Sequence, residues 1–515
     1  MGGRAVKGAR HALTDPVDVL VIGTGAGGAP VLAELARAGL KVVALEAGPR
    51  FTARDYTPDE ITAATFYWRE ERLSAGETPQ AFGGNNSGFG VGGSMLHYGA
   101  FMPRIDARDF HLFSETGQGV DWPFGRDTLL PYMERVEEEI GVSGPMPYPW
   151  EPTRRFTDAP PPRNAAAEAM LRGCAALGIR ASDGPAALIT RARNGRGACV
   201  NCGACHQGCR NGAKSGVDNS FLRRAEQDGA EIRPGCFAHG IETNAAGRVT
   251  GVVYRHEGVD YRQACGTLIL AAGAVETARL LLHTGLANRS GQVGRNYMAH
   301  VSTQVWGRLP EETRPNKGYP SLAITEEMMR PADADFVGGY LIQSLGMMPL
   351  TWATNVARGR GLWGPDLTRA LAGYNHAVGL GAHGDCLPHD GNRVTLSDEP
   401  GMASVPKPLI SFSYGANERA MHAHAERTLR AILAAAGAED IWAMPRDAHM
   451  IGTCRMGNDP ESSVVDPFGR SHDIENLWIC DHSVFPSATA ANPALAIMAL
   501  SLRMAENLTA RRGRP

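Results

Sequence analysis

Three glycines near the start of the chain stand at a spacing that binds a dinucleotide. Gly23, Gly25 and Gly28 fit G-x-G-x-x-G, and Glu46 follows 18 residues after the last of them. Such glycines let the backbone approach a pyrophosphate at a helix N-terminus, where unpaired N–H groups and the helix dipole favour negative charge. A carboxylate at this distance hydrogen-bonds a ribose hydroxyl, which favours adenosine ribose over a 2′-phosphate. The motif alone leaves NAD and FAD open.

Four cysteines within eleven residues form a second group that could do chemistry. They follow the spacing C-x2-C-x2-C-x3-C and are Cys199, Cys202, Cys205 and Cys209. In a reducing compartment this density indicates metal or redox chemistry before disulfides, and the spacing is that of a ferredoxin. Arg210 stands where ferredoxins carry proline, which argues against an iron–sulfur cluster. A cluster, a zinc ion, a haem attached at C-x-x-C-H and a metal-free thiol-rich loop are all left open.

The glycine motif lies in a frame of predicted strands and helices. A β-branched run at 17–22, the glycine turn, a helix and a second run at 41–46 predict a strand–turn–helix–strand unit. Further on, short strands are predicted at 251–257 and 261–273, followed by a helix at 275–285. This order of elements is typical of an α/β fold.

The middle of the chain is less regular. A second glycine-rich stretch at 81–104 is too long for a hairpin, so we expect it to be ordered by something that it wraps. A proline-rich excursion at 145–162 leads to a helix that begins near Asn164. A strand-like run at 408–414 is followed by an amphipathic helix at 417–437. These segments predict a second unit of sheet and helices.

Composition narrows the class of protein. Hydrophobic residues make up 43% of the chain and charged residues 20%, so the chain can bury a large core and is not disordered. Basic and acidic residues number 51 and 54, and this balance offers no electrostatic basis for binding nucleic acid. No window is apolar for long enough to span a membrane. The leader MGGRAVKGARHALTDP lacks the apolar region of a secretion signal, so we expect a cytoplasmic location.

The chain resembles the glucose–methanol–choline (GMC) family of flavoprotein oxidoreductases over nearly its whole length. The motifs that carry the resemblance occur in a specific order. They are GTGAGG with Glu46, GVGGSMLHYGAFMPR (90–104), AAGAVETARLLLHTG (271–285), VGRNYMAH (293–300), NRVTLS (392–397), HMIGTCRMG (449–457) and NPALAIMAL (492–500).

The resemblance implies an α/β architecture with FAD as cofactor. It implies a Rossmann-like FAD-binding domain built from interleaved segments, plus a smaller sheet-and-helix substrate domain. We assign 15–125, 230–302 and 446–515 to the FAD-binding domain. The substrate domain is assigned to 303–445, and 126–229 holds the proline-rich excursion, a helix and the cysteine-rich loop.

The resemblance also implies a catalytic pair in the last segment, here His449 and Asn492. In the family, an alcohol carbon over the flavin passes a hydride to N5. Removing hydride is easier once the hydroxyl proton has been taken, and imidazole titrates in the working pH range. Many relatives carry histidine at the second position, so asparagine there makes His449 the predicted base. Asn492 then hydrogen-bonds the same substrate oxygen.

Further FAD contacts are implied by the matching motifs. Asp481 falls in a segment that runs under the flavin in the family, and the amides at the start of the helix at 492–500 are expected to face the flavin N1–C2=O edge. His97 stands where some family members attach FAD covalently and others keep an unattached histidine, and both readings are open. The expected contacts in these motifs are Gly93, Ser94, His97, Asp481, Asn492 and Pro493.

The substrate and the electron acceptor are less readable. Sugars, aminosugars or glycosides are the leading substrates, with a simple aliphatic or aromatic alcohol as the alternative. The acceptor is oxygen, a quinone or a redox protein. A nicotinamide-dependent reductase and a non-catalytic flavin subunit are more distant alternatives. A mixed group of side chains suits either a sugar-binding platform or core packing, and consists of Met328, Met329, Tyr340, Gln343, Met347, Met348, Trp352 and Trp363.

Overall fold

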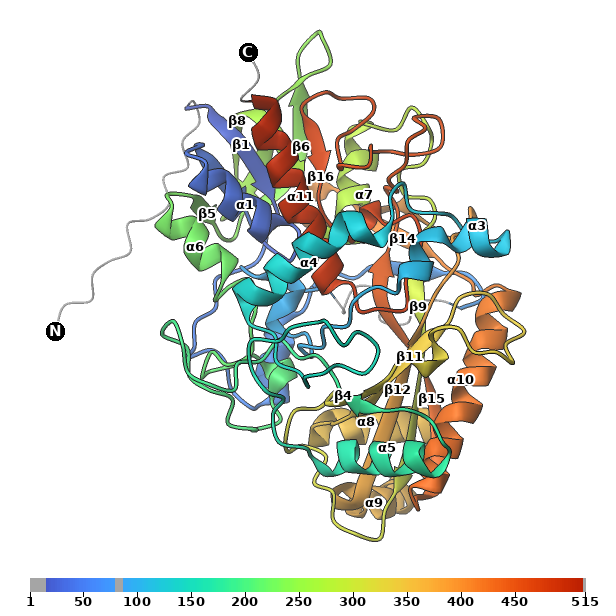
Figure 1. Ribbon diagram of the computed structural model, residues 1–515. Helices are drawn as coiled ribbons and strands as arrows, with labels where there is room; N and C mark the ends of the chain where they lie inside the picture. Colours follow the sequence, from blue (N-terminus) through green and yellow to red (C-terminus); the bar gives the residue numbers. More distant parts are fainter. Residues whose placement is uncertain (1–14, 79–86, 513–515) are drawn as a thin grey trace, which may run out of the picture.

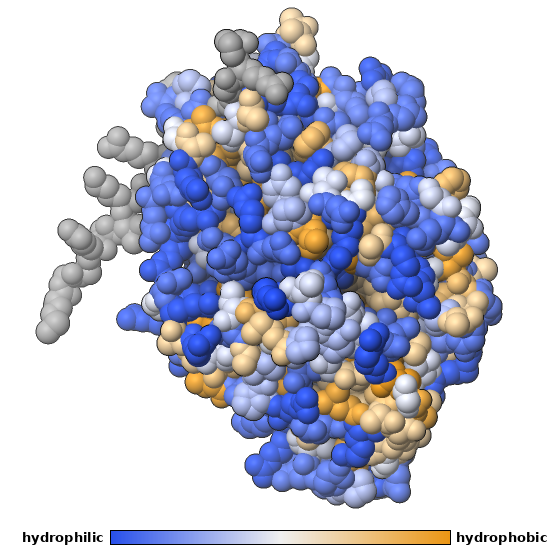
Figure 2. Space-filling view, viewed as in Figure 1, coloured by the Kyte–Doolittle hydropathy of each residue, from blue (hydrophilic) through white to orange (hydrophobic). Residues whose placement is uncertain are grey.

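The computed structural model describes residues 15–78 and 87–512. The leader at 1–14, on which the expected location depends, and 81–86 of the second glycine-rich stretch lie outside the described residues. The polypeptide forms an upper and a lower part, each built around a sheet, with the helix α4 (Arg126–Ile140) lying across the front between them (Figure 1). Figure 2 shows that the same face is largely hydrophilic, with apolar side chains in scattered patches.

The first sheet has the strand order β5-β2-β1-β8-β7-β6, and β16 pairs with β8. β1 lies between β2 and β8 in parallel, with Val19 opposite both Val42 and Thr267. This central position explains the apolar run predicted at 17–22, because a parallel strand covered on both faces buries nearly every side chain. The strands are β1 (Val17–Ile22), β2 (Val42–Leu45), β5 (Glu231–Arg233), β6 (Phe237–Thr243), β7 (Val249–His256), β8 (Val259–Leu270) and β16 (Leu477–Ile479).

The second sheet has the order β15-β9-β12-β11-β10-β4. It is antiparallel throughout. One face packs on helices that carry Trp352 against Trp306 of β9, with ring centroids 5.1 Å apart. The strands are β4 (Ser182–Asp183), β9 (Met298–Arg308), β10 (Ala323–Thr325), β11 (Tyr340–Leu345), β12 (Ala377–Gly384) and β15 (Glu439–Ile451). A small third sheet contains β3 (Leu73–Ala75), β13 (Arg393–Pro400) and β14 (Pro406–Ser411).

The predicted helices form close to their expected bounds. Asn164 caps the helix that follows it, since its side-chain oxygen accepts a hydrogen bond from the Ala167 N–H at 2.9 Å. The helices are α1 (Gly28–Arg37), α2 (Glu60–Ala63), α3 (Leu112–Thr116), α4 (Arg126–Ile140), α5 (Ala165–Ala176), α6 (Phe221–Gln227), α7 (Gly273–Thr284), α8 (Pro349–Arg360), α9 (Gly364–Ala372), α10 (Ala416–Ala435) and α11 (Ala494–Arg512). None of those in the described part is long and apolar enough to cross a bilayer.

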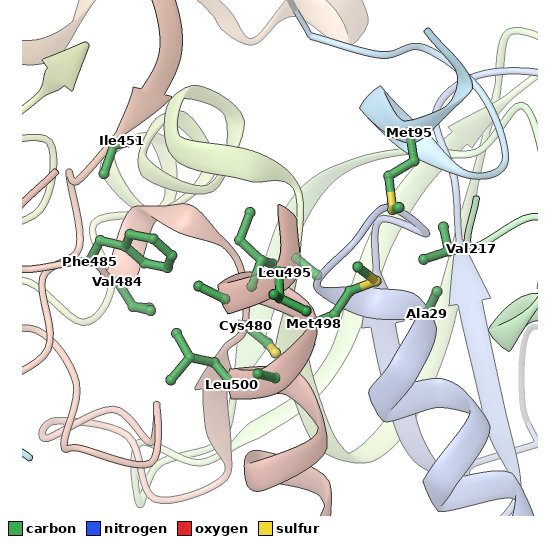
Figure 3. Packing of buried hydrophobic residues seen from close by; sticks show 14 of the residues in the cluster. Ala29, Met95, Val217, Ile451, Cys480, Val484, Phe485, Leu495, Met498 and Leu500 are labelled. Carbon is green, nitrogen blue, oxygen red and sulfur yellow. The ribbon is translucent and has the colours of Figure 1, made fainter. Parts of the chain in front are cut away.

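Segments distant in sequence share one core beside the first sheet. Figure 3 shows Met498 of α11 close to Ala29 of α1, with Met95 and Val217 beside them. All four side chains are at least 98% buried. This packing fixes α11 against α1, and so places the start of the last helix beside the glycine turn.

The mixed α/β fold with a Rossmann-like part is confirmed, as are the strand–turn–helix–strand unit and the helix after Asn164. The proposed domain boundaries stay a prediction. β4 and α5, from the segment 126–229, pack with the second sheet, whereas α4 from the same segment packs on α11.

Candidate active site

A cavity of about 460 Å³ extends from the glycine turn after β1 to the second sheet. Gly23 and Glu46 line it at the end nearer the first sheet, and Gln343 of β11 and His383 of β12 line it at the other. Asn492 lines the same cavity. The residues predicted to bind a dinucleotide and those predicted to do chemistry therefore meet in one space.

Backbone crowding explains the glycines at the first end. Gly23 has φ +95°, and a Cβ there would lie 2.3 Å from the Ala271 carbonyl oxygen. Gly93, with φ +56°, would place a Cβ 2.7 Å from the Cα of Gly25. The loop that carries Gly93 and Ser94 thus packs directly on the glycine turn. Both of these residues line the cavity, as do Gly23 and Gly25 of the glycine motif. Gly28 instead forms the first turn of α1.

Glu46 follows the last residue of β2 and is buried. One carboxylate oxygen accepts hydrogen bonds from the Thr24 N–H at 3.1 Å and the Thr24 hydroxyl at 2.8 Å, and the other accepts from the Gly48 N–H at 3.0 Å. Burial raises the pKa of this carboxyl, while these donors oppose the shift. The donors hold Glu46 at the edge of the cavity, where a ribose would meet it.

His97 lies in the second glycine-rich stretch with its ring stacked on Tyr67, the centroids 4.1 Å apart. Its Nε2 is buried and has no hydrogen-bond partner within the described part of the chain. Burial, with Lys214 nearby, lowers the pKa of His97 to about 3, so the ring is neutral. A neutral ring with an open nitrogen beside the cavity suits a covalent tether to FAD and a simple contact equally.

The cysteine-rich loop packs beneath this segment. Lys214 is buried, and its ammonium donates to the carbonyl oxygens of Cys205 at 2.7 Å, Leu96 at 2.9 Å and Tyr98 at 3.3 Å. His206 of the same loop contacts the His97 carbonyl oxygen through Nδ1 at 2.9 Å. The loop therefore holds the backbone on both sides of His97.

The four cysteine thiols differ in exposure. Cys202 is exposed, Cys205 is buried, and Cys199 and Cys209 are intermediate. Across the described residues, His300, His383 and His449 are the one set of His, Cys, Asp or Glu side chains whose ligand atoms lie close enough together for a single ion. The four thiols of the loop do not belong to this set of described side chains.

His449 occupies an irregular position in β15. The register with β9 shifts between Ala448, which faces His300, and Met450, which faces Ala299. His449 is the extra residue of this bulge and has φ +56°, a left-handed conformation that is uncommon outside glycine. The bulge turns the imidazole toward Asn492, whose side-chain nitrogen lies 3.4 Å from His449 Nε2.

Asn492 lies just before α11. The first i→i−4 bond of that helix runs from the Ile497 N–H to the Pro493 carbonyl at 2.9 Å, so the amides of the first turn have no acceptor within the helix. Pro493, Ala494 and Ile497 line the cavity. The positive end of the α11 dipole thus faces the space where the predicted base lies. The side-chain oxygen of Asn492 is buried and lacks a partner in the described region.

Asp481 is placed at the start of another helix. Its carboxylate accepts from the Gly273 N–H at 2.9 Å and the Thr277 hydroxyl at 2.7 Å, both of α7, and from the Ser483 N–H at 2.8 Å. It also lines the cavity. Asp481 therefore joins α7 to the segment after β16 at the floor of the site.

Two further histidines lie beside the predicted base. The ring centroid of His449 lies 4.8 Å from that of His300 and 5.4 Å from that of His383, and the two Nδ1 atoms of His449 and His300 are 3.1 Å apart. Gln343 contacts His383 Nε2 through its side-chain nitrogen at 2.8 Å. Two neutral imidazole nitrogens at this distance share one hydrogen, so His449 and His300 form a hydrogen-bonded pair.

Burial controls the protonation of all three rings. It lowers the pKa of His300 to about 3 and that of His383 to about 4, and places the pKa of His449 well below its usual value. The neighbouring imidazoles lower the His300 and His449 values further, because each would repel a second positive charge. All three rings are therefore neutral near pH 7.

Several residues of the site had no role in the sequence analysis. His383 lies in no recognisable motif, and His300 ends the matching motif at 293–300 without a role of its own. His482 also lines the cavity, and its Nε2 accepts from the Ala274 N–H at 3.3 Å. The mixed group of side chains divides: Gln343, Met347 and Met348 line the cavity, whereas Trp352 is buried against β9 and Trp363 is 83% exposed.

These features fit FAD. The glycine turn and Glu46 suit the adenosine and pyrophosphate, and the α11 amides suit a flavin edge that becomes negative on reduction. The unpaired polar atoms of His97 and Asn492 are buried beside the same cavity. Such atoms are costly unless something binds them, so they support a polar ligand in this space. The fold and site together define a dinucleotide-dependent oxidoreductase.

Comparison with family models identifies the family. Models described as GMC oxidoreductase match residues 70–302 and 388–501, and the chain belongs to this family. It is 28% identical to the fructose dehydrogenase large subunit of Gluconobacter japonicus, over 95% of this chain and 97% of that protein. It is also 28% identical to paromamine 6′-oxidase of Streptomyces fradiae, over 95% of this chain and 90% of that protein.

A third relative and two solved structures extend the comparison. The 2-methyl-1,2-propanediol dehydrogenase of Mycolicibacterium austroafricanum is 28% identical, over 96% of each chain. Pyridoxine 4-oxidase from Mesorbium loti superposes with a TM-score of 0.66 at 16% identity, over 95% of this chain and 99% of that one. A formate oxidase from Aspergillus oryzae gives 0.68 at 15%, over 97% and 99%. The chain is an oxidoreductase, and the family and fold support FAD as its cofactor.

The buried ammonium of Lys214 gives a test of how the cysteine-rich loop is held. Lys214→Met keeps most of the side-chain volume but leaves three carbonyl oxygens without their donor. An unsatisfied buried group costs about 1–3 kcal/mol, so we expect unfolding free energy to fall by roughly that amount or more, with FAD retained less tightly. Thermal or urea unfolding with bound FAD measured by absorbance would check this.

Lys407→Met is the matched control. Lys407 is paired at the surface with Glu71 at 3.0 Å and Glu399 at 2.9 Å, and such pairs contribute about 0–1 kcal/mol. Equal stability losses in the two variants would contradict the clamping role of Lys214.

Proposed function

We propose that this enzyme oxidises an alcohol group to a carbonyl with FAD as hydride acceptor, using His449 as base and Asn492 as its hydrogen-bonding companion. The observation that carries the proposal is the meeting of His449 Nε2 and the Asn492 side chain, 3.4 Å apart, in a cavity that also contains the dinucleotide-binding glycines. A base and a donor that converge on one point can take a hydroxyl proton and hold the oxygen it leaves.

Bound FAD would supply the hydride acceptor at flavin N5. His449 Nε2 accepts the hydroxyl proton of the substrate, because its buried ring is neutral and the hydroxyl takes the place of the Asn492 side chain at its single lone pair. Asn492 donates a hydrogen bond to the same oxygen, which limits the charge that builds on it. The α11 amides and Pro493 close this side of the cavity, and the helix dipole favours negative charge there. His97, stacked on Tyr67, would bind or tether the flavin.

The cavity wall favours a substrate with several hydroxyl groups, and we propose a sugar, aminosugar or glycoside. Ser302 and Gln304 of β9, Gln343 of β11 and Arg446 of β15 all line the cavity. The Gln343 side-chain oxygen is buried without a partner in the described region, and a substrate hydroxyl would satisfy it. Two relatives are named for fructose and paromamine, and these names support this substrate class.

A simple alcohol is the alternative substrate. Met347 and Met348 form an apolar part of the wall, and one relative is named for a small diol. The names of the relatives include both dehydrogenases and oxidases, so oxygen, a quinone and a redox protein are all acceptors to test.

Anaerobic reduction of the flavin tests the proposed reaction. We expect sugars to bleach the visible flavin absorbance faster than simple alcohols in a stopped-flow panel. His449→Ala should slow this step by about 10²–10⁴-fold with FAD still bound, the usual effect of losing a well-placed base. His472→Ala is the control, because His472 contacts Ser463 at 3.0 Å outside the cavity. A normal rate in His449→Ala would exclude it as base.

The lowered pKa of His449 has a consequence for pH dependence. A base works in its neutral form, and a pKa well below 6.5 keeps that form dominant at pH 6.5. We therefore expect the limiting rate of flavin reduction to stay level as the pH falls from about 8 to about 6.5 and to decline only below that. Half-loss of the rate at or above pH 6.5 would contradict a buried base. Stopped-flow measurements at saturating substrate would provide the profile.

We propose that the cysteine-rich loop is a metal-free structural loop. Its main-chain ties to the segment that carries His97 support this role, as does the spread from exposed Cys202 to buried Cys205. Anaerobically purified, active enzyme is expected to lack iron and acid-labile sulfide. At least about three irons per chain would instead support a cluster on Cys199, Cys202, Cys205 and Cys209, which could pass single electrons to a quinone or protein.

A further inference from the structure

His300 contacts His449 and does not itself line the cavity. Its side chain is fully buried, and its ring stands at 69° to that of His449 with centroids 4.8 Å apart. Within the described part, His383, His449 and Asn492 line the cavity and His300 does not. His300 therefore acts on a substrate through its neighbours, of which His449 is the one in hydrogen-bond contact.

The contact between the two rings can contain only one hydrogen. His449 Nδ1 and His300 Nδ1 are 3.1 Å apart, a hydrogen-bond distance. A neutral imidazole has one N–H and one lone pair, so one of these atoms must donate and the other must accept. The protonation state of each ring is thus coupled to that of the other.

The contact of His449 with Asn492 determines which of the two Nδ1 atoms donates. Asn492 presents its side-chain nitrogen to His449 Nε2 at 3.4 Å, and an amide nitrogen has hydrogens but no lone pair to offer. His449 Nε2 must therefore accept, which places the single ring hydrogen of His449 on Nδ1. That hydrogen points at His300 Nδ1, which accepts it.

We propose that His300 is a positioning residue that fixes the tautomer of His449, so that the Nε2 lone pair faces the substrate hydroxyl. This inference rests on the proposed role of His449 as base. A second imidazole here does the work that a carboxylate does in many histidine-containing sites, namely to accept the Nδ1 hydrogen and orient the ring.

The same contact matters during proton transfer. The substrate O–H bond breaks and an Nε2–H bond forms on His449, which becomes a cation in a buried site. Its Nδ1–H then bonds to His300 with one charged partner, and such bonds are about twice as strong as neutral ones. The contact is therefore stronger in the state that the reaction must reach, so its loss should lower the rate more than substrate binding.

The backbone holds His300 for this task. His300 of β9 pairs with Ala448 of β15, next to the bulge that contains His449. The Tyr414 hydroxyl donates to the His300 carbonyl oxygen at 3.0 Å. Ser302 and Gln304, two and four residues on, share the same face of β9 and line the cavity.

Three substitutions separate the acceptor atom from side-chain size and polarity. His300→Asn places an oxygen, attached to Cγ, where Nδ1 stood and keeps the acceptor. His300→Leu places a methyl group at that position and removes it. His300→Gln is polar but carries its oxygen one bond further out. Stopped-flow reduction by substrate gives the limiting rate and the apparent substrate Kd for each, with FAD content and Tm measured alongside.

We expect His300→Leu and His300→Gln to lower the limiting rate about 10- to 100-fold, the effect of losing one hydrogen bond to a charged group, with the Kd changed less than about twofold. His300→Asn should recover most of the rate. Equal rates in the Asn and Gln variants, a normal rate in the Leu variant, or a loss confined to the Kd would each overturn the inference.

A readout independent of turnover comes from the tautomer itself. ¹⁵N-histidine NMR of the FAD-bound enzyme, with His449→Ala used to assign the signal, should place the His449 hydrogen on Nδ1, and His300→Gln should shift it toward Nε2. A hydrogen on Nε2 in the unmodified enzyme would overturn the inference even if His449 is the base. If no alcohol reduces the flavin, the proposed function fails, whereas the tautomer result still decides the role of His300.

Discussion

The antiparallel pairing of β9 with β15 is the constraint on which the site depends. β9 follows α7 of the first part of the molecule, and β15 precedes β16, so two neighbouring strands at one edge of the second sheet are tied to the dinucleotide fold at the same place. A slip of one residue would turn Ser302 and Gln304 away from the cavity, because side chains alternate between the two faces of a strand. It would also separate His300 from His449. The arrangement of the candidate site therefore depends on the register of these two strands.

The buried imidazoles depend on this register in their energetics as well. A buried polar group is tolerated when it is hydrogen-bonded, and a partly satisfied network is costly. His449 meets Asn492 and His300, and His383 meets Gln343. Each contact spans different strands or segments, so each is available only in the folded arrangement. The low dielectric that makes these groups costly also keeps them neutral, which is the state a base requires.

The sequence predicted the features that depend on residues close together in the chain or on a specific motif. The strand–turn–helix–strand unit follows from local pattern and glycine spacing, and the end of the proline-rich segment predicted the helix that begins near Asn164. His449 and Asn492 were found through motifs of the family. His300 and His383 were assigned no role. They lie 149 and 66 positions before His449 in the sequence, and their contacts with it depend on strand register, which no local pattern encodes. The hydrogen bonds of Lys214 likewise could not be predicted, because they depend on which carbonyl oxygens the folded loop brings to its ammonium.

The bulge at His449 is an irregularity on which the geometry of the candidate site depends. Ala448, His449 and Met450 are consecutive, yet all three line the cavity. A regular strand could not do this, because it points neighbouring side chains to opposite faces. The left-handed backbone at His449 costs about 1–3 kcal/mol for a residue other than glycine, and such strain persists where the surrounding structure over-determines it. Glycine would relieve the strain but carries no imidazole. The chain thus keeps a strained residue where the proposed base contacts Asn492 on one side and His300 on the other.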